Sequence, residues 1–151
     1  MKKVFRSAML IIAMILATIS SSSAVTALDL DGNDYNVVLV CNGDAGDYCD
    51  KGDTVKDVFM FEDDSFMIKS FEDELFGLGA QGEYSSSGFS FNADLEVISD
   101  DLVDKYEFDI NGISLLDTLL IGSAEITYSK LSFTGYDKKD EATAYFFGIK
   151  K

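Results

Sequence analysis

The alternation of apolar and polar residues along Phe89–Val97 is the feature that most constrains the fold of this chain. The apolar members are Phe89, Phe91, Ala93, Leu95 and Val97, and the polar members between them are Ser90, Asn92, Asp94 and Glu96. The segment Lys105–Ile110 repeats the pattern, with Tyr106, Phe108 and Ile110 on its apolar side. A period of two with one wet face is typical of antiparallel β-strands. We therefore expect an all-β fold in which these apolar residues point inward.

Other segments are rich in β-branched and aromatic residues and predict further strands. They are Tyr35–Cys41, Val55–Glu62, Ser65–Phe71, Leu75–Tyr84, Thr118–Tyr128 and Thr143–Ile149. The short run Leu131–Thr134 either extends the strand before it past a bend or stands alone. Polar links are expected at Glu62–Ser65, Ser85–Gly88 and Asp137–Glu141. The pair Asn111-Gly112 predicts a hairpin if its two flanks pair with each other.

About eight strands with short connections favour pairing between sequence neighbours. Closure of such a meander removes its exposed edges, so we expect an up-and-down antiparallel barrel in one domain spanning residues 28–151. A two-sheet β-sandwich is the alternative. A membrane barrel is disfavoured because the predicted strands carry charges on the face opposite their aromatic residues.

The first 27 residues have the layout of a secretory signal peptide, with Lys2, Lys3 and Arg6 before an apolar run and small residues at the end. Cleavage is expected after Ala24 or after Ala27. The apolar run is shorter than the roughly 20 residues of a membrane-spanning helix. No cysteine lies near the cleavage positions to carry a lipid. We therefore expect a periplasmic or secreted protein without stable membrane insertion.

The two cysteines, Cys41 and Cys49, are expected to form a disulfide bond in an oxidising compartment. A redox-active pair would favour a tighter C-x-x-C spacing and an activating neighbour. The short loop between the two cysteines predicts a structural crosslink.

The charge and composition exclude several classes of function. The chain has 12 Lys and Arg residues and 27 Asp and Glu residues, and loss of the leader leaves 12 − 3 = 9 basic side chains, a formal net charge of 9 − 27 = −18. This balance argues against nucleic acid as a partner and is compatible with a basic protein partner. The chain lacks His, and no catalytic constellation, cofactor motif or metal site is predicted. The segment Asp29–Asp34 resembles a calcium loop but lacks its Gly and Glu at the required positions, so we interpret it as a flexible polar lead-in.

Three segments resemble the later strands of small bacterial exported lipocalin-like proteins. They are GEYSSSGFSFNADL (Gly82–Leu95), KYEFDINGISLLDTLLIGSAEITY (Lys105–Tyr128) and YFFGIKK (Tyr145–Lys151). The resemblance covers about two-thirds of the mature chain by the order of its hairpins. It implies a calycin-type barrel that holds an apolar ligand, but the Gly-x-Trp of that family is missing because the chain has no Trp. No binding residue can be carried over by motif.

Two functions remain open, and both assume a monomer that is not an enzyme. The first is an exported carrier of a small apolar ligand, with candidate ligand-binding residues in the barrel interior. These candidates are Tyr84, Phe89, Phe91, Tyr106, Phe108, Tyr128 and Phe146. The second is an acidic protein-interaction or inhibitor module of the cell envelope, with a packed core and no ligand. Glycines in two predicted strands (Gly77, Gly79, Gly82 and Gly122) mark either bends or internal space, and a filled interior would favour the second function.

Overall fold

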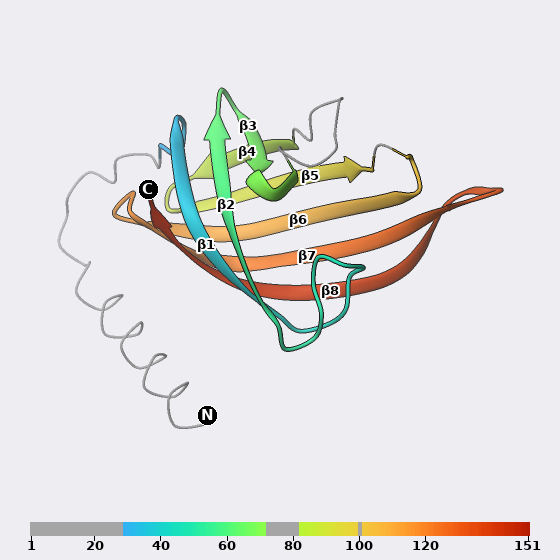
Figure 1. Cartoon of the computed structure of the whole chain (residues 1–151). Helices are drawn as coiled ribbons and strands as arrows, with labels where there is room; N and C mark the ends of the chain where they lie inside the picture. The colour runs from blue at the N-terminus through green and yellow to red at the C-terminus, as the bar shows by residue number, and fades with distance from the viewer. Residues whose placement is uncertain (1–28, 72–81, 100) are drawn as a thin grey trace.

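Eight antiparallel strands form a closed ring in the computed structural model, which describes residues 29–71, 82–99 and 101–151 (Figure 1). The elements are β1 (Asn33–Cys41), β2 (Thr54–Glu62), β3 (Ser65–Ile68), the 3-10 helix η1 (Lys69–Phe71), β4 (Gly82–Ser87), β5 (Ser90–Ile98), β6 (Asp104–Leu115), β7 (Leu119–Ser132) and β8 (Gly135–Lys150). Each strand pairs with its sequence neighbours, and β1 pairs with β8 to close the ring. The predicted up-and-down barrel is confirmed, and the sandwich alternative is not adopted.

The ring is uneven in strand length. Strands β6, β7 and β8 contain 12, 14 and 16 residues, whereas β3 contains 4. Among the described residues, β3 and β4 pair at two positions, Ser65 with Glu83 and Phe66 with Gly82. The β7–β8 hairpin reaches beyond the other strands at one end of the barrel (Figure 1). The sheet is therefore strongest around β5–β8 and weakest between β3 and β4.

The alternation predicted for β5 and β6 is confirmed from Phe91 onward. Phe91, Ala93, Leu95 and Val97 are all buried inside the ring, as are Phe108 and Ile110 of β6. The expectation for Phe89 is wrong, because this residue lies in the β4–β5 turn beside Gly88 and its side chain is 47% exposed. The two-residue turn starts the strand one position later than the alternation predicted.

The tight link predicted at Glu62–Ser65 is confirmed as a two-residue turn. Asp63 and Asp64 have φ angles of 49° and 63°, the left-handed conformation that such hairpin turns require. Asp31 accepts a hydrogen bond from the Asp63 N–H at this turn. Leu30 is buried, so the segment before β1 is a packed turn at the barrel end and not the flexible lead-in we expected.

The hairpin signal at Asn111-Gly112 is misleading, because both residues lie inside β6. Asn111 pairs with Asn92 on β5, and the β6–β7 turn falls later, at Leu116 and Asp117, with φ angles of 56° and 52°. A Cβ on Gly112 would come within 2.6 Å of the ring of Phe91. Gly112 is therefore required for close packing inside the barrel and not for a turn.

The loop predicted at Asp137–Glu141 is also wrong, because these residues belong to β8. They pair with the end of β7, which Leu131 and Ser132 extend past an irregularity at Tyr128 and Ser129. This part of the hairpin projects beyond the buried core, so neither face needs apolar residues and the alternation disappears. The polar composition that indicated a loop reflects solvent on both sides of the hairpin.

Several predictions lie outside the described residues. They concern the leader with its two cleavage positions and most of the predicted strand Leu75–Tyr84, including Gly77 and Gly79. Among the residues that are described, no helix is long and apolar enough to cross a membrane.

Candidate functional site

One end of the barrel interior is filled by aromatic rings in mutual contact. Phe61 has its ring centroid 5.0 Å from that of Tyr84, 5.2 Å from Phe66 and 5.6 Å from Phe91. Most of these contacts are edge-to-face, the arrangement that aromatic quadrupoles favour. Phe146 joins the same group through Phe59 and Phe91. This group, which also includes Tyr35, forms a continuous packed layer.

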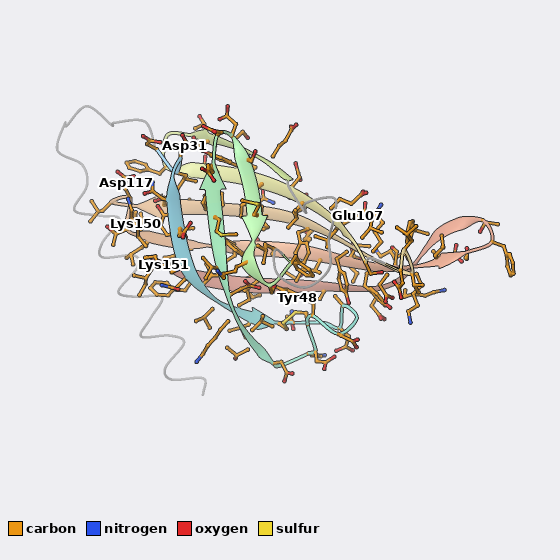
Figure 2. The ribbon with its side chains drawn as sticks, turned by 45° about the horizontal axis from the view of Figure 1, so that its top comes forward. Asp31, Tyr48, Glu107, Asp117, Lys150 and Lys151 are labelled. Carbon is orange, nitrogen blue, oxygen red and sulfur yellow. A yellow bond between two sulfur atoms is a disulfide. The ribbon has the colours of Figure 1, made fainter. Side chains whose placement is uncertain are left out.

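A second group of rings closes the opposite end of the interior. Tyr48, from the loop between β1 and β2, packs 5.2 Å from Phe71 and 5.3 Å from Phe108. Phe71 in turn contacts Tyr106, which stacks on Tyr128 at 5.1 Å. Figure 2 labels Tyr48 away from the end of the barrel where Asp117, Lys150 and Lys151 lie. The β1–β2 loop therefore contributes a ring to the core.

The predicted disulfide holds this loop in place. Cys41 and Cys49 are bonded with their Cα atoms 5.8 Å apart, and both are buried, as is Ala45. The N–H of Ala45 donates to the carbonyl of Cys49 across the loop. Gly46 lies so close to Tyr106 and Tyr128 that a Cβ would meet the Tyr106 hydroxyl at 2.6 Å. The cystine loop is a cap over the second ring group.

Small residues inside the barrel make room for the rings. Gly112 and Gly122 face each other across β6 and β7, and a Cβ on Gly122 would lie 2.6 Å from the ring of Phe146. The sequence suggested that glycines in the strands mark either a bend or space for a ligand. Neither interpretation holds for Gly122. It provides the space that an aromatic side chain of the protein itself occupies.

The seven ligand-binding candidates do not form one pocket. Tyr84, Phe91 and Phe146 belong to the first ring group, and Tyr106, Phe108 and Tyr128 belong to the second. Phe89 is exposed in its turn. The six interior rings are in contact with other rings of the core, so they act as packing residues in this structure.

One hollow lies on the outer face of β4–β7. It has a volume of about 620 Å³, and six carboxylate side chains line it, those of Glu83, Asp94, Glu96, Glu107, Asp109 and Glu125. All six belong to outward-facing, exposed positions of their strands. Figure 2 places Glu107 on the side of the barrel away from the end marked by Lys150 and Lys151.

Four of these carboxylates lie in one row across four strands, which we call the acidic row. Glu83 is directly opposite Asp94, Asp94 is opposite Asp109, and Asp109 is opposite Glu125. Neighbouring strands are about 4.8 Å apart, so the row extends over about 14 Å. Like charges placed directly opposite each other destabilise a sheet. The acidic row therefore has an energetic cost that the fold does not require.

Beside the acidic row, one lysine of the chain, Lys105, forms salt bridges with two carboxylates. The ammonium of Lys105 lies 2.9 Å from Glu96 and 3.1 Å from Glu107, which face each other on β5 and β6. These carboxylates, Glu96 foremost, raise the pKa of Lys105 against the opposing effect of burial. Within the described part of the chain, no salt bridge involves Glu83, Asp94, Asp109 or Glu125. The acidic row therefore offers carboxylates like those that hold Lys105, but no lysine or arginine of the described residues forms a salt bridge with them.

A second hollow, of about 350 Å³, lies between the β2–β3 turn, the segment before β1 and strand β4, and is also acidic. Asp29, Asp31, Asp63 and Asp64 line it together with Tyr84. Burial, followed by these carboxylates, raises the pKa of Tyr84. Asp31 already holds the β2–β3 turn, so part of this cluster has a structural role. Among the described residues, no group of three or more His, Cys, Asp or Glu side chains could hold a metal ion.

The sequence contains only part of the signal for the acidic row. Asp94 and Asp109 occupy the polar positions of the two alternating segments, but their alignment depends on strand register, which alternation does not supply. Comparison of the chain with protein-family models, with curated proteins and with solved structures finds no match. The fold is consistent with a calycin-like barrel.

Proposed function

We propose that this protein is an exported binding module that uses the acidic row to hold a basic segment of another protein. The observation that carries the proposal is the alignment of Glu83, Asp94, Asp109 and Glu125 in one hollow of the outer face. Ammonium and guanidinium groups spaced along an extended or helical segment would relieve the repulsion within this row. The Lys105 site, with two carboxylates around one ammonium, is the local precedent for such contacts.

The packed interior supports an outer binding surface over an internal one. A small apolar ligand would have to displace rings such as Phe61 and Phe91, which contact each other at 5.6 Å. Burial of an aromatic side chain is worth a few kcal/mol, so each displaced ring would reduce the affinity of such a ligand. The carrier function suggested by the family resemblance therefore has less support than the interaction function.

Two further features agree with the proposal. The Cys41–Cys49 disulfide fits a protein that works in an oxidising compartment outside the cytoplasm. The net charge of −15 for the whole chain would attract a cationic partner over long range and speed its association at low salt. Both features would act together on a basic partner in the periplasm or outside the cell.

The test is the binding of a fluorescent decalysine peptide, followed by anisotropy at low and at physiological ionic strength. The double variant Asp94→Asn/Asp109→Asn removes the centre of the acidic row. The matched control Asp137→Asn/Asp140→Asn removes the same charge from the β7–β8 hairpin. At about 0.5–1 kcal/mol for each exposed ion pair, the row variant should bind about tenfold more weakly and the control less than twofold.

Equal losses in the two variants would show that the peptide responds to net charge alone and would overturn the proposal. Binding of calcium but not of decalysine, measured by calorimetry in the same buffer, would also overturn it. Thermal stabilisation of the wild-type protein by an apolar compound, without an effect of the row variant, would favour the carrier function instead.

A further inference from the structure

Exposed apolar side chains gather at the end of the barrel where the β7–β8 hairpin projects (Figure 1). Phe133, in the turn of this hairpin, is fully exposed, and Leu131 beside it is 49% exposed. In the neighbouring β5–β6 loop, Leu102 and Val103 are exposed by 54% and 37%. These four residues, together with the partly buried Tyr136, form a cluster that we call the apolar tip.

The two loops of the apolar tip form one ordered surface. The N–H of Leu131 donates to the carbonyl of Val103, which ties the hairpin to the β5–β6 loop. The hydroxyl of Tyr136 donates to the carbonyl of Leu102 and makes the same connection from the other strand of the hairpin. The exposed apolar side chains are therefore presented together by the fold.

The turn at the centre of the tip is free of charge and satisfies some of its own polar groups. Residues 131–136 include no Asp, Glu, Lys or Arg, in a chain in which 26% of the residues are charged. The Ser132 hydroxyl donates to the carbonyl of Gly135 and accepts from the N–H of Thr134. Hydrogen bonds within the turn suit contact with a medium that offers none of its own.

Three lysines flank the apolar tip on its barrel side. Lys130 precedes it on β7, and Lys138 and Lys139 follow it on β8. Lys130 is three positions from Phe133, about 10 Å at about 3.4 Å per residue. Apolar side chains of peripheral proteins enter a lipid surface by about 5–10 Å, so the lysines would lie at the level of the headgroup phosphates. Lys130 and Lys138 have carboxylate neighbours at 3.9 and 2.7 Å but stay about half exposed, and such surface pairs are weak enough to exchange for phosphate.

The negative charge of the chain does not bar a zwitterionic lipid surface from the tip. Residues 129–141 contain three basic and three acidic side chains, a formal charge of 3 − 3 = 0. In the neighbouring loop, Asp101 accepts hydrogen bonds from the Ser99 hydroxyl and the Val103 N–H. Glu125 of the acidic row is eight positions from Phe133, about 27 Å along β7, whereas the screening length at physiological salt is about 8 Å.

We propose that the apolar tip docks this protein reversibly on a phospholipid surface, with Phe133 entering the lipid and the three lysines near the phosphates. The tip is convex and projects from the barrel, so a fluid surface can close around it without a preformed pocket (Figure 1). A few apolar side chains give marginal, reversible binding, which agrees with the expected lack of stable membrane insertion. Docking does not depend on the acidic row. Insertion of apolar side chains should change little with salt, whereas the binding of decalysine should weaken.

The test uses tryptophan fluorescence, because the chain contains no Trp. Phe133→Trp places one tryptophan at the tip, and the matched control Phe89→Trp places one in the β4–β5 turn at the opposite end of the barrel. Each mature variant is titrated with phosphatidylcholine vesicles to about 10 mM lipid, a range that covers marginal membrane binding. We expect a blue shift of the emission, with quenching by brominated lipid, for Phe133→Trp and neither effect for Phe89→Trp.

Co-sedimentation with the same vesicles measures the contribution of the native side chain. Phe133→Ser should partition into the lipid at least tenfold more weakly than the wild-type protein, whereas Phe89→Ser should change less than twofold. Both values should be similar at low and at physiological salt.

A wild-type protein that does not sediment with the vesicles, or unchanged emission of Phe133→Trp, overturns the proposal. Equal effects at positions 133 and 89 overturn it as well, because docking would then not depend on the tip. Binding only to vesicles that contain phosphatidylglycerol, abolished at physiological salt, would assign the contact to the lysines alone and overturn insertion. A blue shift of Phe133→Trp with lipid-free cell-envelope protein, but not with vesicles, would assign the tip to a protein pocket instead.

Discussion

Replacement of Asp94 by Asn should stabilise the protein, because Asp94 lies between two carboxylates. It is directly opposite Glu83 on β4 and Asp109 on β6. Side chains in such pairs have Cβ atoms about 5 Å apart, and each pair is worth about 0.2–1 kcal/mol. Loss of two repulsive pairs should therefore raise the free energy of unfolding by about 1 kcal/mol at low salt. For a domain of this size, the melting temperature should rise by about 3–5 °C.

The assay is urea unfolding followed by circular dichroism at low and at high salt. The gain should shrink at about 1 M salt, where the screening length is about 3 Å. Asp137→Asn is the matched control, since Asp137 faces Lys130 and the same substitution there removes an attraction. If Asp94→Asn is no more stable than the wild type, or if Asp137→Asn gains as much, the strain assigned to the acidic row does not exist.

Two further predictions concern the cap and the buried tyrosines. The variant Cys41→Ala/Cys49→Ala should lose about 2.5 kcal/mol of unfolding free energy, the loop-closure value for this short loop, and an unchanged urea midpoint would contradict the structural role of the disulfide. Burial, and then the hydrogen bond that its hydroxyl donates to Asp104, raise the pKa of Tyr128. The folded state therefore keeps a proton that the unfolded state releases, so the stabilisation is complete below the ordinary tyrosine pKa near 10 and is lost as the pH rises above it. Unfolding free energies that stay constant from about pH 9 to pH 11, or that fall equally in Tyr128→Phe, would contradict this assignment.

Local pattern predicted the barrel because alternation, turn residues and short connections all agree on antiparallel neighbours. The alternation also predicted which residues of β5 and β6 point inward, because in a strand with one buried face the apolar residues occupy that face. The turn at Asn111-Gly112 was misread because a glycine required beneath an aromatic ring has the same sequence signal as a glycine required for a turn. The hairpin end of β8 was missed because a strand that is wet on both faces shows no alternation.

The acidic row could not be predicted from the sequence because it depends on register between strands, as do the outer apolar pairs of β1 and β8. Asp94 and Asp109 are 15 positions apart in the chain, and only the β5–β6 register makes them neighbours. In the same way, Val38 and Phe147 come from the two ends of the barrel sequence and meet only when the ring closes. The sequence supplies the charged and apolar residues, and the register of the closed sheet decides which of them become neighbours.

The most direct test of the proposed function is a map of backbone amide chemical shifts while decalysine is titrated into the ¹⁵N-labelled mature protein. The predicted result is a contiguous set of shifted amides on β4–β7 around Glu83, Asp94, Asp109 and Glu125, with little change in β1 or in the interior residues of β2. These shifts should be lost in Asp94→Asn/Asp109→Asn. Shifts that spread over all acidic surfaces, or that centre on the cystine loop, would contradict a binding site at the acidic row.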